Sequence, residues 1–211
     1  PAVTKMKEII DNGELGEIYY LYAQRVNLGK VRSNENALWS FAPHDISVVL
    51  HLFNAVPDRV TANGVCYLQK DIQDVVFATL YFPDNRMAHI HLSWLDPHKE
   101  RKITLVGSKK MAVFDDMSSS EKIRIYDKGA NLSGEILSYQ EAITLRNGDI
   151  YIPRIDMKEP LSIECAHFID CIKNNKKPET DGKNGLEVVK VLEAAQRSLE
   201  TGGHPVKLEE I

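Results

Sequence analysis

The sequence predicts an α+β fold, an open-faced and mainly antiparallel mixed sheet with helices packed on one face. Three observations predict it. Helical periodicity occurs near the N-terminus and again after residue 160, residues 59–126 are rich in β-forming residues, and short turn sequences join consecutive β-rich segments. Serial hairpins with helices at both ends of the chain favour one sheet beside one layer of helices.

The first elements are a helix, a strand and a second helix. Apolar residues recur at helical spacing through residues 3–10, and Asn12-Gly13 is a typical helix stop. The segment from Glu17 to Val26 carries apolar and aromatic groups on both faces, which predicts a strand covered on both sides. Pro43 suits the first turn of the next helix, whose buried stripe ends at Asn54.

The middle of the chain alternates between strands and turns. Pro83-Asp84-Asn85 and residues 107–110 are short loops that join strands into hairpins. Residues 128–153 are less regular and include Gly134, so we expect a long excursion with some strand. The predicted strands are residues 60–68, 75–82, 86–94, 101–106, 111–114 and 122–126.

Two helices and a short strand complete the prediction. The first helix runs from Pro160 to Lys173 and the second from Gly182 to Ser198, where Gly202-Gly203 ends it. A short final strand follows at residues 205–208. The apolar stripe of the first of these helices consists of Ile163, Ala166, His167, Phe168, Ile169 and Ile172.

Composition excludes several functional classes. The chain has 211 residues and a net charge of −4, so it has no strong positive field to hold nucleic acid. No apolar run approaches the ~20 residues that span a bilayer, and the N-terminus has no signal peptide pattern. Cys66, Cys165 and Cys171 lack C-x-x-C spacing, which favours reduced thiols and a cytoplasmic location. Because the chain starts at Pro1 inside a helical pattern, we expect it to be part of a longer protein.

Residues 37–46 carry the best candidate for chemistry. Ser40 and His44 are four residues apart and lie on one face if the segment is helical. An imidazole exchanges protons near neutral pH, so His44 is a candidate general acid or base; the alternative is a histidine at a helix start that bonds to backbone. Asp45 is expected to favour the helix dipole as a capping carboxylate.

Charged residues at strand ends are candidates for binding an anion. Arg25, followed by Asn27, can clamp a phosphate or a carboxylate, or it can form an ordinary surface ion pair. Lys99 and Arg101 leave the same two alternatives open.

The remaining motifs have structural alternatives. His89 and His91 lie on one face of a strand and, with Asp96, have a spacing that can bind metal, but packing or a dimer face is the preferred interpretation, and we assign no metal. Trp94 is interpreted as a core or interface residue rather than a platform for sugar. The sequence contains no G-x-G-x-x-G, P-loop or G-x-S-x-G motif, so this chain has no visible means of binding a dinucleotide.

Six segments spread along nearly the whole chain form a recognisable set. They are Gly13-Glu14-Leu15-Gly16-Glu17-Ile18, Arg25-Val26-Asn27-Leu28-Gly29, residues 36–46, Trp94-Leu95-Asp96-Pro97, Gly107-Ser108-Lys109-Lys110-Met111 and Thr180-Asp181-Gly182. Together these segments resemble the C-terminal domain of a Gfo/Idh/MocA-family oxidoreductase, nearest the branch of nucleotide-sugar dehydrogenases.

The resemblance implies a two-domain enzyme. An N-terminal Rossmann domain, absent from this chain, would bind NAD or NADP and supply a lysine from a Glu-Lys-Pro motif. Residues 1–12 would be the helix that follows it, and residues 13–211 would bind a sugar or nucleotide sugar and self-associate through the open sheet face. The isolated chain is then expected to be inactive and to bind no cofactor tightly.

The resemblance also implies roles for individual residues. The family motif places an aspartate four residues before a histidine, and His44 matches the histidine while Ser40 stands where the aspartate is usual. Serine can orient a hydroxyl but cannot be a carboxylate base. His44 is therefore the expected acid or base, and the residues expected to line or brace the substrate site are Arg25, Asn27, Asn36, Trp39, Ser40 and Asp45. The alternative is a stand-alone, non-catalytic module for ligand binding or dimerisation.

Overall fold

The computed structural model describes residues 1–132 and 143–211, which form one nine-stranded sheet and four α-helices. The strand order is β8-β7-β6-β5-β1-β4-β3-β2-β9. The helices are α1 (Ala2–Asp11), α2 (Ala37–Phe53), α3 (Pro160–Asn174) and α4 (Gly182–Glu200). The strands are β1 (Ile18–Val26), β2 (Arg59–Val65), β3 (Val75–Tyr81), β4 (Met87–Ser93), β5 (Glu100–Gly107), β6 (Met111–Asp115), β7 (Ile123–Leu132), β8 (Ile143–Tyr151) and β9 (Val206–Lys207), followed by the 3-10 turn η1 (Leu208–Glu210).

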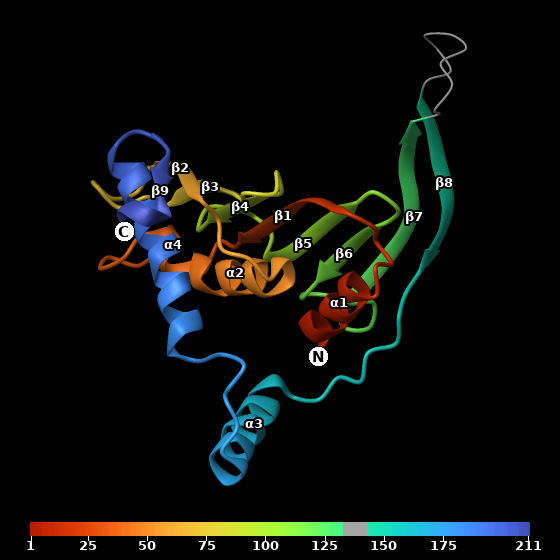
Figure 1. Cartoon of the computed structure of the whole chain (residues 1–211). Helices are drawn as coiled ribbons and strands as arrows, with labels where there is room; N and C mark the ends of the chain where they lie inside the picture. The colour runs from red at the N-terminus through yellow and green to blue at the C-terminus, as the bar shows by residue number, and fades with distance from the viewer. Residues whose placement is uncertain (133–142) are drawn as a thin grey trace.

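The sheet is mixed because one of its strand pairs is parallel. β1 pairs in parallel with β4 and antiparallel with β5, whereas the other pairs are antiparallel. A parallel pair needs a crossover connection, and the segment between β1 and β4 supplies it with α2, β2 and β3. Figure 1 shows α1, α2 and α4 on one side of the sheet. The predicted fold class is confirmed.

The described helices cover one face of the sheet and leave the other open, which corrects the expectation for β1. Leu21 and Ala23 are fully buried on the side of the helices. Tyr20 and Tyr22 lie on the opposite side, where Tyr20 is exposed and Tyr22 is half-buried. The aromatic residues that suggested a second covering layer therefore lie on the open face.

Helix α2 begins six residues earlier than Pro43 indicated. The side chain of Asn36 accepts a hydrogen bond from the backbone N–H of Trp39 at 3.1 Å and so caps the first turn. Pro43 is inside the helix, where its missing N–H removes one backbone bond. The helix continues through it because nine of its residues are buried against the sheet and α4. It ends at Asn54, as predicted, in a left-handed conformation (φ 47°).

The described residues of the excursion expected over 128–153 include two paired strands, so the expected strand content is present. β7 extends to Leu132 and β8 covers Ile143–Tyr151, with a register shift between Tyr126 and Lys128. Figure 1 shows these two strands reaching beyond the rest of the sheet. Gly134 lies outside the described residues.

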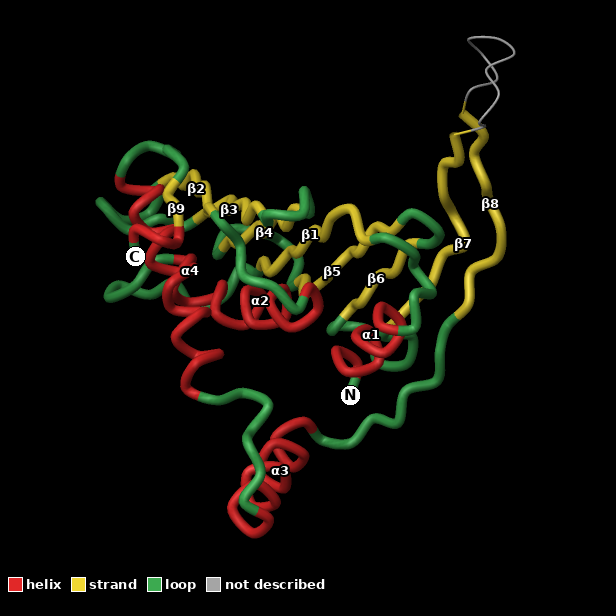
Figure 2. Tube along the Cα trace, in the orientation of Figure 1, coloured by secondary structure: helices red, strands yellow, loops and turns green. Residues whose placement is uncertain are grey.

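Helix α3 forms where predicted, but its apolar stripe is not covered. Figure 2 shows α3 away from the sheet, below the layer of α1, α2 and α4. Cys171 is the buried residue of this helix. The exposed large apolar side chains on it are Leu161, Ile163, Phe168, Ile169 and Ile172.

Candidate functional site

A cavity of about 470 Å³ lies between the C-terminal end of β1, helix α2 and the start of β5. Four of its lining residues are cationic and one is a carboxylate. The lining consists of Arg25, Asn27, Lys30, Arg32, Ser40, Phe41, His44, Arg101 and Asp116. Five sequence candidates therefore meet at one place, namely Arg25, Asn27, Ser40, His44 and Arg101.

His44 and Ser40 reach this cavity because α2 is helical from Ala37 onward. Their spacing of four residues places both on the same side of the helix. The pKa of His44 is lowered, first by partial burial of the ring and then by the positive charge of Arg25; Asp45 opposes this effect, and Arg101 adds a further lowering. The imidazole is therefore neutral near physiological pH and can accept a proton.

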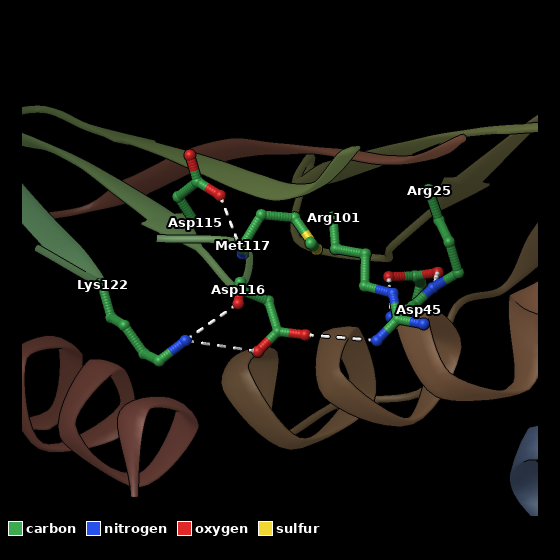
Figure 3. A network of polar contacts seen from close by, with 7 residues as sticks. All are labelled: Arg25, Asp45, Arg101, Asp115, Asp116, Met117 and Lys122. Atoms are coloured by element: carbon green, nitrogen blue, oxygen red, sulfur yellow. Dashed lines mark hydrogen bonds and ion pairs between the residues drawn. The ribbon is translucent and has the colours of Figure 1, made fainter. Parts of the chain in front are cut away.

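Arg25 is held by Asp45 in a two-pronged ion pair. Its Nε donates to Asp45 Oδ2 at 2.6 Å and its Nη2 to Oδ1 at 3.1 Å, as Figure 3 shows. The Asp45 side chain is only 3% exposed and that of Arg25 17%. The expected capping role of Asp45 is wrong, because the helix starts at Ala37 and Asp45 lies in its third turn, where the guanidinium of β1 neutralises it.

Arg101 is held more loosely, by Asp116 in the turn after β6. The Arg101 Nη1 to Asp116 Oδ2 distance is 3.5 Å, and both side chains are more than 40% exposed. Lys122 fixes the same turn by donating to the Asp116 carbonyl at 2.8 Å, with its Nζ 3.8 Å from Oδ1. Among the described residues, Asp116 is thus shared between two cations, whereas Asp45 forms an ion pair with Arg25 alone.

Asn36 and Trp39 are turned away from this cavity and do not line it. The Asn36 amide donates to the side-chain oxygens of Gln73 and Gln196, at 2.9 and 3.0 Å. The Trp39 indole N–H also donates to Gln196, at 3.2 Å. Both residues tie the start of α2 to α4. Their proposed contact with substrate has no support in this geometry.

Sequence reasoning missed four lining residues. Lys30 and Arg32 follow Gly29 in the β1–α2 loop, and their proximity to Arg25 along the chain was an available signal. Phe41 lies between Ser40 and His44 in the same segment. Asp116 is in a turn far away in the sequence, and nothing in the sequence pattern marks it.

His89 and His91 lie on the open face of the sheet. The His91 ring stacks on Phe77 with centroids 4.4 Å apart, and His89 lies beside Tyr22 at 5.9 Å. His89 Nδ1 is 3.0 Å from the Thr79 hydroxyl. Burial lowers the pKa of both histidines. Across residues 1–132 and 143–211, no group of three or more His, Cys, Asp or Glu side chains is arranged to hold a metal ion.

A larger cavity of about 590 Å³ lies between α1, α2 and the start of α4. Its lining includes His51, an exposed residue in the last turn of α2. Its lining contains no arginine, whereas three arginines line the smaller cavity beside His44. The smaller cavity is therefore the candidate functional site.

The start of α2 is not arranged like the pyrophosphate site of a Rossmann domain. Rossmann domains hold the pyrophosphate on free N–H groups at the start of the helix that follows the first strand. Here the helix after β1 is α2, whose Ala37 N–H donates to the Gln73 carbonyl at 2.9 Å and whose Trp39 N–H is capped by Asn36. These two N–H groups are already engaged, so we assign no pyrophosphate to the start of α2.

No helix in the described part of the chain is long and apolar enough to cross a bilayer. Trp94 is fully buried, as its interpretation as a core residue required.

Comparison with known proteins agrees with the fold. A family model described as "GFO/IDH/MocA C-terminal domain" matches residues 3–113. The chain is 22% identical over 219 residues to the uncharacterized oxidoreductase YrbE of Bacillus subtilis (strain 168), covering 99% of this chain and 60% of that protein.

Two solved structures show the same architecture. UDP-N-acetylglucosamine 3-dehydrogenase GnnA from Acidithiobacillus ferrooxidans matches with a TM-score of 0.71 and 21% identity, over 93% of this chain and 61% of that one. The WlbA dehydrogenase from Bordetella pertussis, solved with NADH and UDP-GlcNAcA, matches with a TM-score of 0.69 and 19% identity, over 98% and 60%. At these identities the likeness shows the fold. The chain spans about 60% of the length of the relatives it matches.

Proposed function

This chain belongs to the GFO/IDH/MocA family as its C-terminal domain, and we propose that it is the substrate-binding domain of an oxidoreductase that oxidises a hydroxyl of a sugar or nucleotide sugar with NAD or NADP. The observation that carries the proposal is His44, which lines a cavity between two arginines and is neutral near physiological pH. A hydroxyl that loses hydride must also lose a proton, and a neutral imidazole can take it.

In this proposal Ser40 orients the substrate and His44 accepts its proton. Ser40 is one helical turn from His44 on the cavity wall, so its hydroxyl can bond a neighbouring hydroxyl of the sugar. It cannot serve as a second carboxylate base. The Arg25–Asp45 pair braces β1 against α2 and fixes the position of His44.

The hydride acceptor is assigned to a part of the protein outside this chain. The solved WlbA relative was crystallised with NADH and a nucleotide sugar, and GnnA is named for a nucleotide sugar. These names, together with the size of the cavity, support a sugar or nucleotide sugar as substrate.

The exposed apolar side chains of α3 support a role within a larger assembly. Leu161, Phe168 and Ile172 are each more than 60% exposed on one short helix. Contiguous exposed apolar side chains of this kind usually mark an interaction surface. We therefore propose that the isolated chain is inactive and works with a cofactor domain. With no membrane-spanning helix described and its cysteines free, the cytoplasm is the proposed location.

We also propose that the open sheet face associates with a second copy of the chain. Tyr20, Phe77 and Met87 are exposed there beside the stacked histidines. Sedimentation of the purified chain, with Phe77→Glu as the variant, tests this part. A monomer at all concentrations contradicts it.

The test of the proposed activity uses the reading frame that precedes Pro1 in the source genome. A G-x-G-x-x-G sequence followed by Glu-Lys-Pro in that frame supports the proposal. The protein expressed from the whole frame should reduce NAD or NADP in the presence of a sugar or nucleotide sugar, and His44→Gln should lower kcat strongly. Activity that is unchanged in His44→Gln refutes the role of this residue.

A stand-alone binding module is the second candidate. Ser40 favours it, because this position carries an aspartate in the family motif and serine is a weaker catalytic group. The same reading frame distinguishes the two proposals. A start codon close to Pro1 with no dinucleotide motif supports the module and refutes the dehydrogenase.

A further inference from the structure

The candidate cavity holds two arginines in direct cross-strand register. Arg25 on β1 is the pairing partner of Arg101 on β5, and both side chains line the cavity next to His44. Like charges directly opposite each other on neighbouring strands destabilise a sheet. Two arginines can occupy such positions when anions neutralise their charges. The carboxylates that already bind each arginine therefore indicate how many of its N–H donors remain available to a further anion.

The two arginines differ in how fully they are neutralised. Arg25 makes two short hydrogen bonds to the buried carboxylate of Asp45. Among the described residues the Arg101 guanidinium has one ion-pair partner, Asp116, at 3.5 Å, and the Asp116 side chain is 43% exposed and also shared with Lys122. The guanidinium of Arg101 therefore has more N–H donors available to a further anion than that of Arg25.

The β1–α2 loop adds two further cations to the same wall. Arg32 is paired with Glu35 at 2.9 Å. Lys30 is exposed, lines the cavity and forms no ion pair within the described part of the chain. The positive charge of the cavity that is least neutralised therefore lies on Lys30 and Arg101.

We propose that the substrate carries a negatively charged group, a carboxylate or a phosphate on the sugar, that binds to Arg101 and Lys30 beside His44. A guanidinium offers paired donors to either group, and a lysine adds a point charge. The anion would take the place that Asp116 holds at Arg101 and relieve the repulsion between Arg25 and Arg101. This inference rests on the proposed function of the same cavity and narrows its substrate to acidic sugars.

Binding to the 211-residue chain tests the inference without a cofactor. We would follow ¹⁵N-labelled protein by NMR during titration with glucuronate, glucose 6-phosphate, glucose and inorganic phosphate. Glucuronate, glucose 6-phosphate or both should bind at least about tenfold more tightly than glucose, as expected for one charge-assisted hydrogen bond. Tighter binding of glucuronate identifies a carboxylate, and tighter binding of glucose 6-phosphate identifies a phosphate.

Variants locate the preference in the cavity. Arg101→Met should bring the affinity for the preferred acid down to about that for glucose. Asp116→Asn removes the competing carboxylate and should raise that affinity severalfold. Lys99→Met is the matched control, because Lys99 is exposed close to Arg101 in the sequence but does not line the cavity. If Arg101→Met does not fold, two other measurements test whether positive charge causes the preference for the acid over glucose. Both Lys30→Met and 0.5 M salt should reduce that preference.

Three results would overturn the inference. They are equal affinity for glucose and both acids, a preference that survives Arg101→Met or Lys30→Met, and inorganic phosphate that binds as tightly as the sugar acids. The proposed function fails separately, because it depends on turnover. Turnover without an acid preference refutes only the inference, and an acid preference without turnover in the complete protein refutes only the dehydrogenase.

Discussion

Replacing Asp45 by leucine should destabilise this domain far more than breaking an exposed ion pair does. The change leaves the Arg25 guanidinium, whose side chain is 17% exposed, without its partner. Removing one member of a buried pair costs about 3–5 kcal/mol, since the remaining charge stays desolvated. Because Arg25 keeps some contact with water, we expect about 3 kcal/mol. For a domain of this size that lowers the unfolding midpoint by about 6–12 °C.

The double variant Arg25→Met/Asp45→Leu gives the reasoning its sharpest test. Replacing a whole buried pair by apolar side chains of similar volume is often nearly neutral, so the double variant should be more stable than either single variant. Both are measured by thermal and urea unfolding followed by circular dichroism. The matched control is Arg32→Met, which breaks the 2.9 Å ion pair between Arg32 and Glu35. The side chains of this pair are 48% exposed for Arg32 and 30% exposed for Glu35. That change should cost less than about 1 kcal/mol.

Two results would refute this reasoning. If Asp45→Leu costs no more than Arg32→Met, the pair between β1 and α2 does not behave as a buried one. If the double variant is as unstable as the two single variants added together, the loss comes from packing rather than from the unpaired charge.

Three further predictions concern the frame around the site. Asn36→Ala should cost about 1–2 kcal/mol in urea unfolding because α2 loses its cap, and Asn36→Asp, which keeps the acceptor oxygen, should lose less. Gly107→Ala should cost about 1–3 kcal/mol of stability, since an added Cβ would collide with the Leu15 carbonyl. In the control variant Gly185→Ala in α4 the added Cβ meets no atom, so this change should be neutral or stabilising. Equal effects of the two changes on stability would show that no collision occurs at Gly107. Burial lowers the pKa of His89 and His91, so the unfolded chain takes up protons before the folded one as the pH falls below about 6.5. The unfolding midpoint should therefore drop between pH 7.5 and pH 5.5. An equal drop in the variant His89→Gln/His91→Gln would contradict this prediction.

Much of the fold follows from local pattern. The period of the apolar residues predicts α1 and α4, and the turn sequences at Pro83 and Gly107 predict their hairpins, because these signals depend on near neighbours in the chain. The start of α2 was misjudged for a local reason as well. Pro43 resembles a first-turn residue, yet Asn36 caps the helix earlier and buried contacts hold the helix together across the proline.

The exposed apolar stripe of α3 is a feature that the sequence pattern does not predict. Its apolar residues have helical spacing, and the helix forms, but spacing alone does not state which surface covers them. β1 shows the same limit, because its aromatic residues predicted a covered second face that lies open in this chain.

For the site, the sequence by itself determined that Ser40 and His44 share one side of a helix, since a spacing of four residues is a property of the helix alone. It did not determine the electrostatics around them. Only the tertiary structure decided that Arg25 faces both Asp45 and Arg101, that Asp116 reaches the same cavity, and that Trp39 turns toward α4. The physical reason is that these contacts depend on strand register and helix packing, which join residues 15 to 157 positions apart in the chain.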